Sequence, residues 1–227
     1  IKQAIEKIKK SKKPIIISGG GVFYSDAMDE LGSFAIKHNI PVTQTVMGYS
    51  TMKRDHSHFL GPIGGLGGRA ANNLAKETDL AICVGTKLAD FTTGSWANFE
   101  NPEFKLVSIN IARHDANKHL AEAVIGDAKV CLSELSNSLG NWKSPDSWHK
   151  KSQDELKSWN EYVDKESGPT NQETPNYAHA VGAIYRNSDP TDIAVTAAGG
   201  LVGEVVQVWR PKELNTHETE WGFSCMS

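Results

Sequence analysis

Short apolar runs alternate with segments of helical periodicity along the first 140 residues of the chain. The apolar runs predict buried strands at residues 15–17, 41–45, 80–85, 105–110 and 122–125. Between them, helical spacing predicts helices at residues 4–10 and 69–76. Two further helices are expected to begin at side-chain caps: one at Ser25 or Asp26, running to about residue 38, and one at Asp127, running to residue 139. Continuously apolar strands are typical of a parallel sheet that helices cover on both faces. The pattern therefore predicts an α/β fold, a doubly wound, Rossmann-like parallel sheet over residues 1–140.

The pattern changes between residues 141 and 173, where polar residues dominate. Three tryptophans stand among Lys, Ser, Asp and Glu, namely Trp142, Trp148 and Trp159. A cap at Asp146 or Ser147 predicts one helix to about residue 165, before a Gly-Pro pair interrupts the chain. We interpret this segment as a linker between domains, with one helix whose tryptophans pack against a neighbour.

Residues 174–227 begin a second α/β unit. A helix is expected at 176–186, a short buried strand at 192–196, and a further helix at 201–209 directly after two glycines. One clear strand cannot bury both of its faces. We therefore expect an incomplete second unit, and we interpret the chain as a piece of a longer protein.

Composition narrows the class of protein. Of the 227 residues, 39% are hydrophobic and 22% charged, as in soluble globular proteins, and the net charge of −3 does not favour a nucleic-acid partner. No stretch reaches the roughly 18 apolar residues of a membrane span, and no signal peptide leads the chain. Cys83, Cys131 and Cys225 are far apart and predict reduced thiols rather than a disulfide framework. We expect a cytoplasmic protein with neither a membrane nor a nucleic acid as partner.

Two local patterns are candidates for chemistry. Glycines 19–21 follow the first strand, where a helix N-terminus can cradle a pyrophosphate, but Gly-Gly-Gly-Val is not the dinucleotide fingerprint. His56 and His58 supply half of a metal site without a third ligand at suitable spacing, which favours a polar loop. The residues therefore predict no catalytic and no metal-binding side chain.

The order of motifs resembles that of the thiamine diphosphate (ThDP) enzymes related to acetohydroxyacid synthase. The motifs that carry this resemblance are Lys-Pro-Ile-Ile-Ile-Ser-Gly-Gly-Gly at 13–21, Pro-Val at 41–42 followed by Gly48, Phe-Leu-Gly-Pro at 59–62 with the glycine run to 68, Asp-Leu-Ala-Ile-Cys-Val-Gly at 79–85, and Ile-Gly-Asp-Ala-Lys at 125–129. The resemblance implies a central ThDP-enzyme domain over residues 1–140, a linker at 141–173, and the truncated start of a diphosphate-binding domain at 174–227.

Residues 85–96, 198–201 and 220–226 resemble a subgroup of this family that opens a cyclic trihydroxydione in myo-inositol catabolism. The subgroup has also been described as malonic semialdehyde decarboxylases. The resemblance implies hydrolysis of a carbon–carbon bond of a small-molecule substrate with ThDP and Mg²⁺, in a homodimer or homotetramer. The family's catalytic Glu and its Gly-Asp-Gly…Asn metal motif are not in this chain, so the chain alone is expected to be inactive. An acetolactate synthase-like activity and a stand-alone nucleotide-binding module remain alternatives.

The resemblance also implies cofactor-binding residues. Gly199, Gly200, Leu201 and Val202 match the turn that meets the diphosphate, through backbone N–H groups, and Ser224, Cys225 and Met226 match the segment that touches the aminopyrimidine. Equally, the glycines could serve only a tight strand–helix turn. FAD is not expected in the central domain, because Lys87 stands near the position of an Arg in the FAD-binding relatives.

Overall fold

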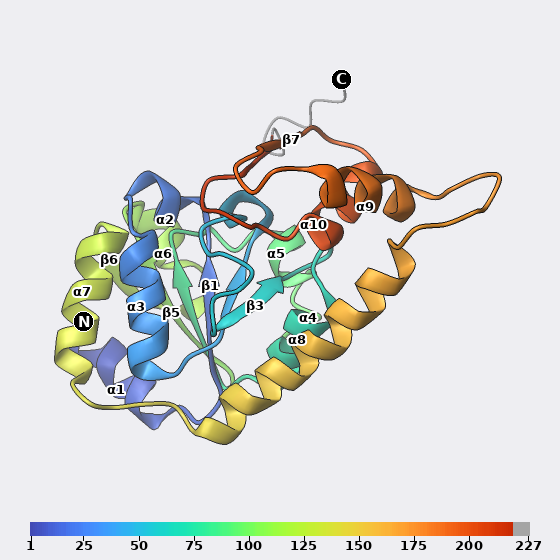
Figure 1. Cartoon of the computed structure of the whole chain (residues 1–227). Helices are drawn as coiled ribbons and strands as arrows, with labels where there is room; N and C mark the ends of the chain where they lie inside the picture. Colours follow the sequence, from blue (N-terminus) through green and yellow to red (C-terminus); the bar gives the residue numbers. More distant parts are fainter. Residues whose placement is uncertain (220–227) are drawn as a thin grey trace.

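The fold is dominated by a six-stranded parallel sheet, seen in a computed structural model that describes residues 1–219. The strand order is β3-β2-β1-β4-β5-β6, and every neighbouring pair is parallel (Figure 1). The strands are β1 (Pro14–Ser18), β2 (Val42–Gln44), β3 (Phe59–Pro62), β4 (Leu80–Val84), β5 (Lys105–Asn110) and β6 (Glu122–Ile125). The predicted doubly wound parallel sheet is confirmed, with its strand order reversing direction between β1 and β4.

Helices cover both faces of this sheet. On one side lie α1 (Lys2–Lys10), α3 (Met28–His38) and α7 (Ala128–Leu139), and on the other α4 (Arg69–Glu77) and α8 (Asp146–Glu166), as Figure 1 shows. Short helices follow the strands at their carboxyl ends: α2 (Gly20–Tyr24), the 3₁₀ turn Val46–Gly48, α5 (Asp90–Thr93) and α6 (Arg113–Ala116). A further 3₁₀ turn, Lys118–Leu120, leads into β6. Among residues 1–219 there is no helix long and apolar enough to cross a membrane.

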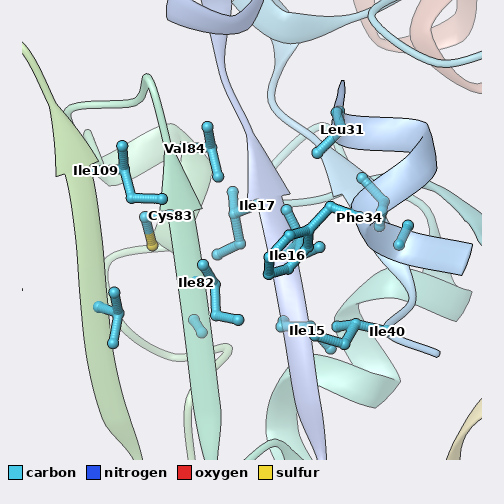
Figure 2. Close-up of a cluster of buried hydrophobic side chains, with 14 of the residues drawn as sticks. Ile15, Ile16, Ile17, Leu31, Phe34, Ile40, Ile82, Cys83, Val84 and Ile109 are labelled. Carbon is cyan, nitrogen blue, oxygen red and sulfur yellow. The ribbon is translucent and has the colours of Figure 1, made fainter. Parts of the chain in front are cut away.

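The core is centred on β1 and β4. Ile15, Ile16 and Ile17 have no exposed surface, and Figure 2 shows them between the side chains of β4 and those of α3, including Leu31 and Phe34. Each such side chain contributes roughly 1.5–3 kcal/mol when it leaves water completely. The uninterrupted apolar run is required because helices cover β1 on both faces.

Two details of the central unit differ from the sequence prediction. The sheet has a sixth strand, β3, which is short, lies at the edge and contains Gly61 and Pro62. Neither Ser25 nor Asp26 caps the long helix, because α2 begins inside the glycine run and Asp26 turns the chain with φ +50° before α3 starts at Met28. By contrast, Asp127 caps α7 as predicted, and its Oδ1 accepts the N–H of Val130 at 3.1 Å.

Helix α8 joins the central sheet to the C-terminal unit. Its cap is not Asp146 or Ser147, since Pro145 precedes its first turn and no side chain caps it. Trp148 is buried and its Nε1 donates to the carbonyl of Pro14 at 2.9 Å, whereas Trp159 donates to Oε1 of Gln207 at 3.1 Å. Trp148 therefore anchors the start of α8 to β1, and Trp159 anchors its C-terminal half to α10.

The C-terminal unit consists of α9 (Tyr177–Asn187), β7 (Ala194–Thr196), α10 (Leu201–Val208) and β8 (His217–Thr219), and β7 pairs in parallel with β8. Strand β7 was predicted to be buried, and this prediction is wrong. Ala194 packs against the α9–α10 cluster on one face, but Val195 on the other is 73% exposed. The partner strand β8 escaped the sequence analysis because it reads His-Glu-Thr and is short.

Candidate functional site

The first candidate site lies where the strand order reverses, at the carboxyl ends of β1 and β4. Gly19 N–H donates to the carbonyl of Val84, and Gly21 N–H to that of Gly85, both at 2.9 Å. A Cβ on Gly21 would stand 2.5 Å from Cα of Gly85. The glycines thus allow two backbone turns to touch, and the N–H groups of Gly19 and Gly21 are not available to a phosphate.

A cavity of about 340 Å³ opens beside these turns. Its walls combine apolar and polar residues: Tyr24, Met47, Ile63, Lys87, Asn110 and Asp115. Asn110 Nδ2 donates to the carbonyl of Thr86 at 3.2 Å, and Asp115 is paired with Lys118. Small ligands of doubly wound sheets bind at this position of the fold. Nucleotide binding at this cavity stays an alternative expected from the sequence, without the N–H groups of Gly19 and Gly21 as a phosphate cradle.

The second candidate site is the turn between β7 and α10, which contains four of the predicted cofactor-binding residues. Gly199 has φ +141°, a conformation that L side chains rarely adopt, and a Cβ there would meet no atom within 4 Å. Gly200 is exposed and Leu201 half-exposed. Val202 instead is buried in a cluster with Val46 and Val206, so only its backbone can face a ligand. The backbone conformation of the turn requires glycine at 199. The open space beside Gly199 also lets a ligand come close to the backbone.

The other three predicted cofactor-binding residues, Ser224, Cys225 and Met226, lie outside the described residues. Their assignment to an aminopyrimidine contact therefore stays a prediction.

A buried polar group that the sequence analysis missed lies beside the second site. His217 on β8 stacks edge to face on Tyr49, with 5.1 Å between ring centroids. Burial lowers the pKa of His217 to about 4 and raises the pKa of Tyr49. Among the described residues, His217 Nε2, Tyr49 Oη and Thr219 Oγ1 are buried without a hydrogen-bond partner. No sequence pattern announces this group, because its members come from loops and a strand that only the fold brings together.

A set of cations around one tyrosine holds the C-terminal unit on the central domain. Arg54 Nη1 donates to Tyr185 Oη at 2.5 Å, and that hydroxyl donates to the carbonyl of Arg210 at 3.0 Å. Arg54, Arg210 and Lys212 all lie within 6 Å of the Tyr185 ring centroid, at 5.8, 5.9 and 4.7 Å. The backbone N–H of Arg54 also donates to the carbonyl of Pro211 at 2.8 Å. The second site is therefore fixed relative to the first.

Metal-binding groups were not predicted from the residues of this chain. The structure brings a third histidine, His149, onto His58, but no set of three or more His, Cys, Asp or Glu within residues 1–219 could hold a metal ion.

Comparison with known proteins decides the family. The sequence model of the thiamine pyrophosphate enzyme central domain matches residues 1–135. The chain belongs to the thiamine pyrophosphate enzymes. Thiamine pyrophosphate is ThDP, so the resemblance seen in the motifs is confirmed, and the six-stranded sheet is the central domain of such an enzyme.

Curated relatives match almost the whole chain. It is 35% identical over 247 residues to the 3D-(3,5/4)-trihydroxycyclohexane-1,2-dione hydrolase of Clostridium perfringens (strain 13 / Type A), covering 99% of this chain and 39% of that protein. Proteins of the same name from Bacillus anthracis and Clostridium tetani are each 36% identical, over 98% and 100% of this chain and 38% and 39% of their own lengths. The chain thus spans about two fifths of the length of these relatives.

Proposed function

We propose that this chain is part of a ThDP-dependent hydrolase that breaks a carbon–carbon bond of a cyclic trihydroxydione, in myo-inositol catabolism. The observation that carries the proposal is the match at 35–36% identity, which extends through the central domain, α8 and the C-terminal unit alike. A match confined to the central domain would support only membership of the family. The continuation of the match over residues 136–227 supports a shared type of reaction.

The residues of the β7–α10 turn fit one edge of a diphosphate site. The open space around Gly199 lets a diphosphate come close to the backbone. The first N–H groups of a helix have no intrahelical partners and can donate to such a group. We assign the backbone N–H groups of Gly200, Leu201 and Val202 to the diphosphate. Val202 holds the start of α10 in place through its contact with Val46 and Val206. Ser224, Cys225 and Met226 are assigned to the aminopyrimidine.

ThDP, when bound, supplies a nucleophilic carbon and an electron sink for the bond that breaks. The part of this chain is to orient it. The Arg54–Tyr185–Arg210 contacts fix the C-terminal unit against the central domain, and with it the direction of the first turn of α10. Burial favours the neutral forms of His217 and Tyr49, and His217 pairs with Ala194 at the amino end of β7.

The chain alone is proposed to be inactive. A Mg²⁺ ion that binds a diphosphate needs hard oxygen ligands, and within residues 1–219 no cluster could hold a metal ion. The catalytic Glu and the metal motif of the family would have to come from other parts of a longer, cytoplasmic protein, which would act as a homodimer or homotetramer.

Sequencing the reading frame that contains this chain tests the proposal. A Gly-Asp-Gly followed downstream by an Asn, at the carboxyl side of Ser227, is expected. Sequence without that motif would overturn the proposal and would leave the cavity at the carboxyl ends of β1 and β4 as the functional unit. A frame with the motif whose product decarboxylates malonic semialdehyde, and does not hydrolyse the dione, would move the chain to the alternative activity.

A further inference from the structure

Four of the chain's eight histidines gather where the start of α8 meets the edge of the central sheet. His56 and His58 belong to the loop before β3, His149 to the first turns of α8, and His38 to the end of α3. The rings of His58 and His149 are stacked, with 4.1 Å between centroids and an interplanar angle of 18°. His56 lies 5.9 Å from His58. We call His56, His58 and His149 the histidine cluster.

Hydrogen bonds place one proton on the ring of His58. Asn39 donates through its amide to Ser144 and Asp146, so its Oδ1 accepts from His58 Nε2 at 3.1 Å. The proton of His58 is thereby assigned to Nε2, and in the neutral ring Nδ1 accepts from the Ser57 hydroxyl, 2.9 Å away.

Two further histidines of this region, His38 and His149, each have one buried nitrogen without a partner among the described residues. His38 Nδ1 donates to the carbonyl of Trp142 at 2.7 Å, while its Nε2 is buried and unpaired among the described residues. His149 Nδ1 is likewise buried and unpaired within residues 1–219. A proton added to either nitrogen would therefore be buried without an acceptor.

The same few residues hold the beginning of α8. Asn39 bridges His58 to Asp146, Ser144 Oγ donates to the carbonyl of Asn39, and Ser144 N–H donates to that of His38 at 2.9 Å. Trp148, next to His149, is buried with its Nε1 on β1. A change of charge on the stacked pair therefore acts directly on the contacts that attach α8 to the sheet.

We propose that the histidine cluster is an acid-sensitive latch, which holds the start of α8 on the sheet while its rings are neutral and releases the helix when the stacked His58–His149 pair takes up protons. Two imidazolium ions at this separation repel each other, and burial denies them water. This inference does not depend on the reaction proposed above.

Burial and, after it, nearby charges set the pH range over which the latch titrates. The charged groups that face these histidines are Asp55 beside His56, Asp146 beside His149, Lys37 and Lys143 beside His38, and Asp29 and Lys53 across the cavity next to His56. Burial, and then the neighbouring His149 and His56, lower the pKa of His58 to about 4, and burial is also the largest cause of the lowered pKa values of His38, His56 and His149. Because the folded pKa values lie below the unfolded value of 6.5, protons favour the released form as the pH falls from about 6.5 towards 4.

Hydrogen exchange followed by mass spectrometry tests the latch on the chain as it stands. After correction for the pH dependence of intrinsic exchange, the protection factors of amides 146–156 should fall at least about tenfold between pH 6.5 and pH 4.5. Strands β1 and β4 should keep theirs over the same range. Loss of protection in α8 and in the core strands at one common pH would overturn the proposal, because the whole domain would then unfold as one unit.

A pair of variants separates charge from packing. His149→Phe keeps an aromatic ring on His58 but takes up no proton, so α8 should stay protected to lower pH. His114→Phe, at an exposed histidine, should behave like the wild type. Proton NMR titration of the wild type should place the imidazoles of His58 and His149 below their ordinary pKa. Ordinary titration of both rings near pH 6.5, with α8 still protected, would refute the latch even if the Phe variant failed to fold.

Discussion

Gly21 and Gly85 show how single residues set the geometry of the central crevice. Each glycine leaves the other room, since a Cβ on either would stand 2.5 Å from Cα of its neighbour. The sequence predicted a turn and a candidate phosphate cradle at Gly19–Gly21. It could not show that the N–H groups of Gly19 and Gly21 are already bound to the carbonyls of Val84 and Gly85. That fact depends on β1 and β4 being neighbours, which is a tertiary property.

Replacing Gly21 by Ala should destabilise the chain. The new methyl group meets backbone, which cannot turn away as a side chain can, and a cost of roughly 1–3 kcal/mol is expected. Chemical denaturation of the chain measures it. Gly203→Ala is the matched control: it lies inside α10 and meets only a Leu66 side-chain atom at 3.6 Å, so it should be neutral or stabilising. Equal stability of the two variants would contradict the close contact.

His217 should make the stability of the chain depend on pH. Its pKa is lowered to about 4 in the folded state, so the unfolded state binds more protons below pH 6.5. The free energy of unfolding should fall by up to about 3 kcal/mol as the pH drops from 6.5 to 4. His217→Phe, which keeps the ring contact with Tyr49, should flatten that dependence in denaturation curves recorded at several pH values. An unchanged slope would show that His217 is accessible to protons in the folded chain.

At the scale of elements, the strands with apolar runs were predicted, including the edge strand β6, whereas the short strands β3 and β8 were not. β1 and β4 are central and buried on both faces, and so their sequences are mainly apolar, while β5 is buried from Leu106 to Ile109. The edge strand β3 contains Gly61 and Pro62, and β8 is three polar or charged residues that form a strand because β7 lies beside them. Local sequence carries little information about strands whose formation depends on a neighbour.

Helix caps, too, were predicted correctly at one position and wrongly at others. Asp127 follows a strand directly and caps α7, so the local signal and the fold agree. Asp127→Ala should cost about 1 kcal/mol, because the N–H of Val130 loses its acceptor. Thermal denaturation is the measurement. Asp154→Ala is the control, since its ion pair with Lys150 is exposed and contributes little. If Asp154→Ala lowered the stability as much as Asp127→Ala, the result would argue against a stabilising cap at Asp127.

On the scale of the whole molecule, α8 and the Tyr185 contacts hold together two α/β units that the sequence analysis described separately. The family and the central fold could be predicted from motifs along the chain. The position of the C-terminal unit against the central domain could not, because it depends on contacts such as Arg54 with Tyr185 and Val46 with Val202, which lie far apart in sequence.

Arg54→Ala should loosen this arrangement. The variant removes the hydrogen bond to Tyr185 Oη and one of the three cations around its ring, and the exposed segment 168–176 should become more accessible to protease. Limited proteolysis with identification of the cut sites is the measurement. Arg113→Ala, at an exposed residue, serves as the control. Identical cleavage of both variants would show that the Tyr185 contacts do not restrain the C-terminal unit.

The most direct test of the proposed function is an assay of the protein encoded by the complete reading frame. The purified protein should hydrolyse 3D-(3,5/4)-trihydroxycyclohexane-1,2-dione when ThDP and Mg²⁺ are present and lose this activity when ThDP is withdrawn, whereas the 227-residue chain alone should show none. Hydrolysis by the complete protein that is unaffected by removing ThDP, or no hydrolysis of the dione under any of these conditions, would contradict the account.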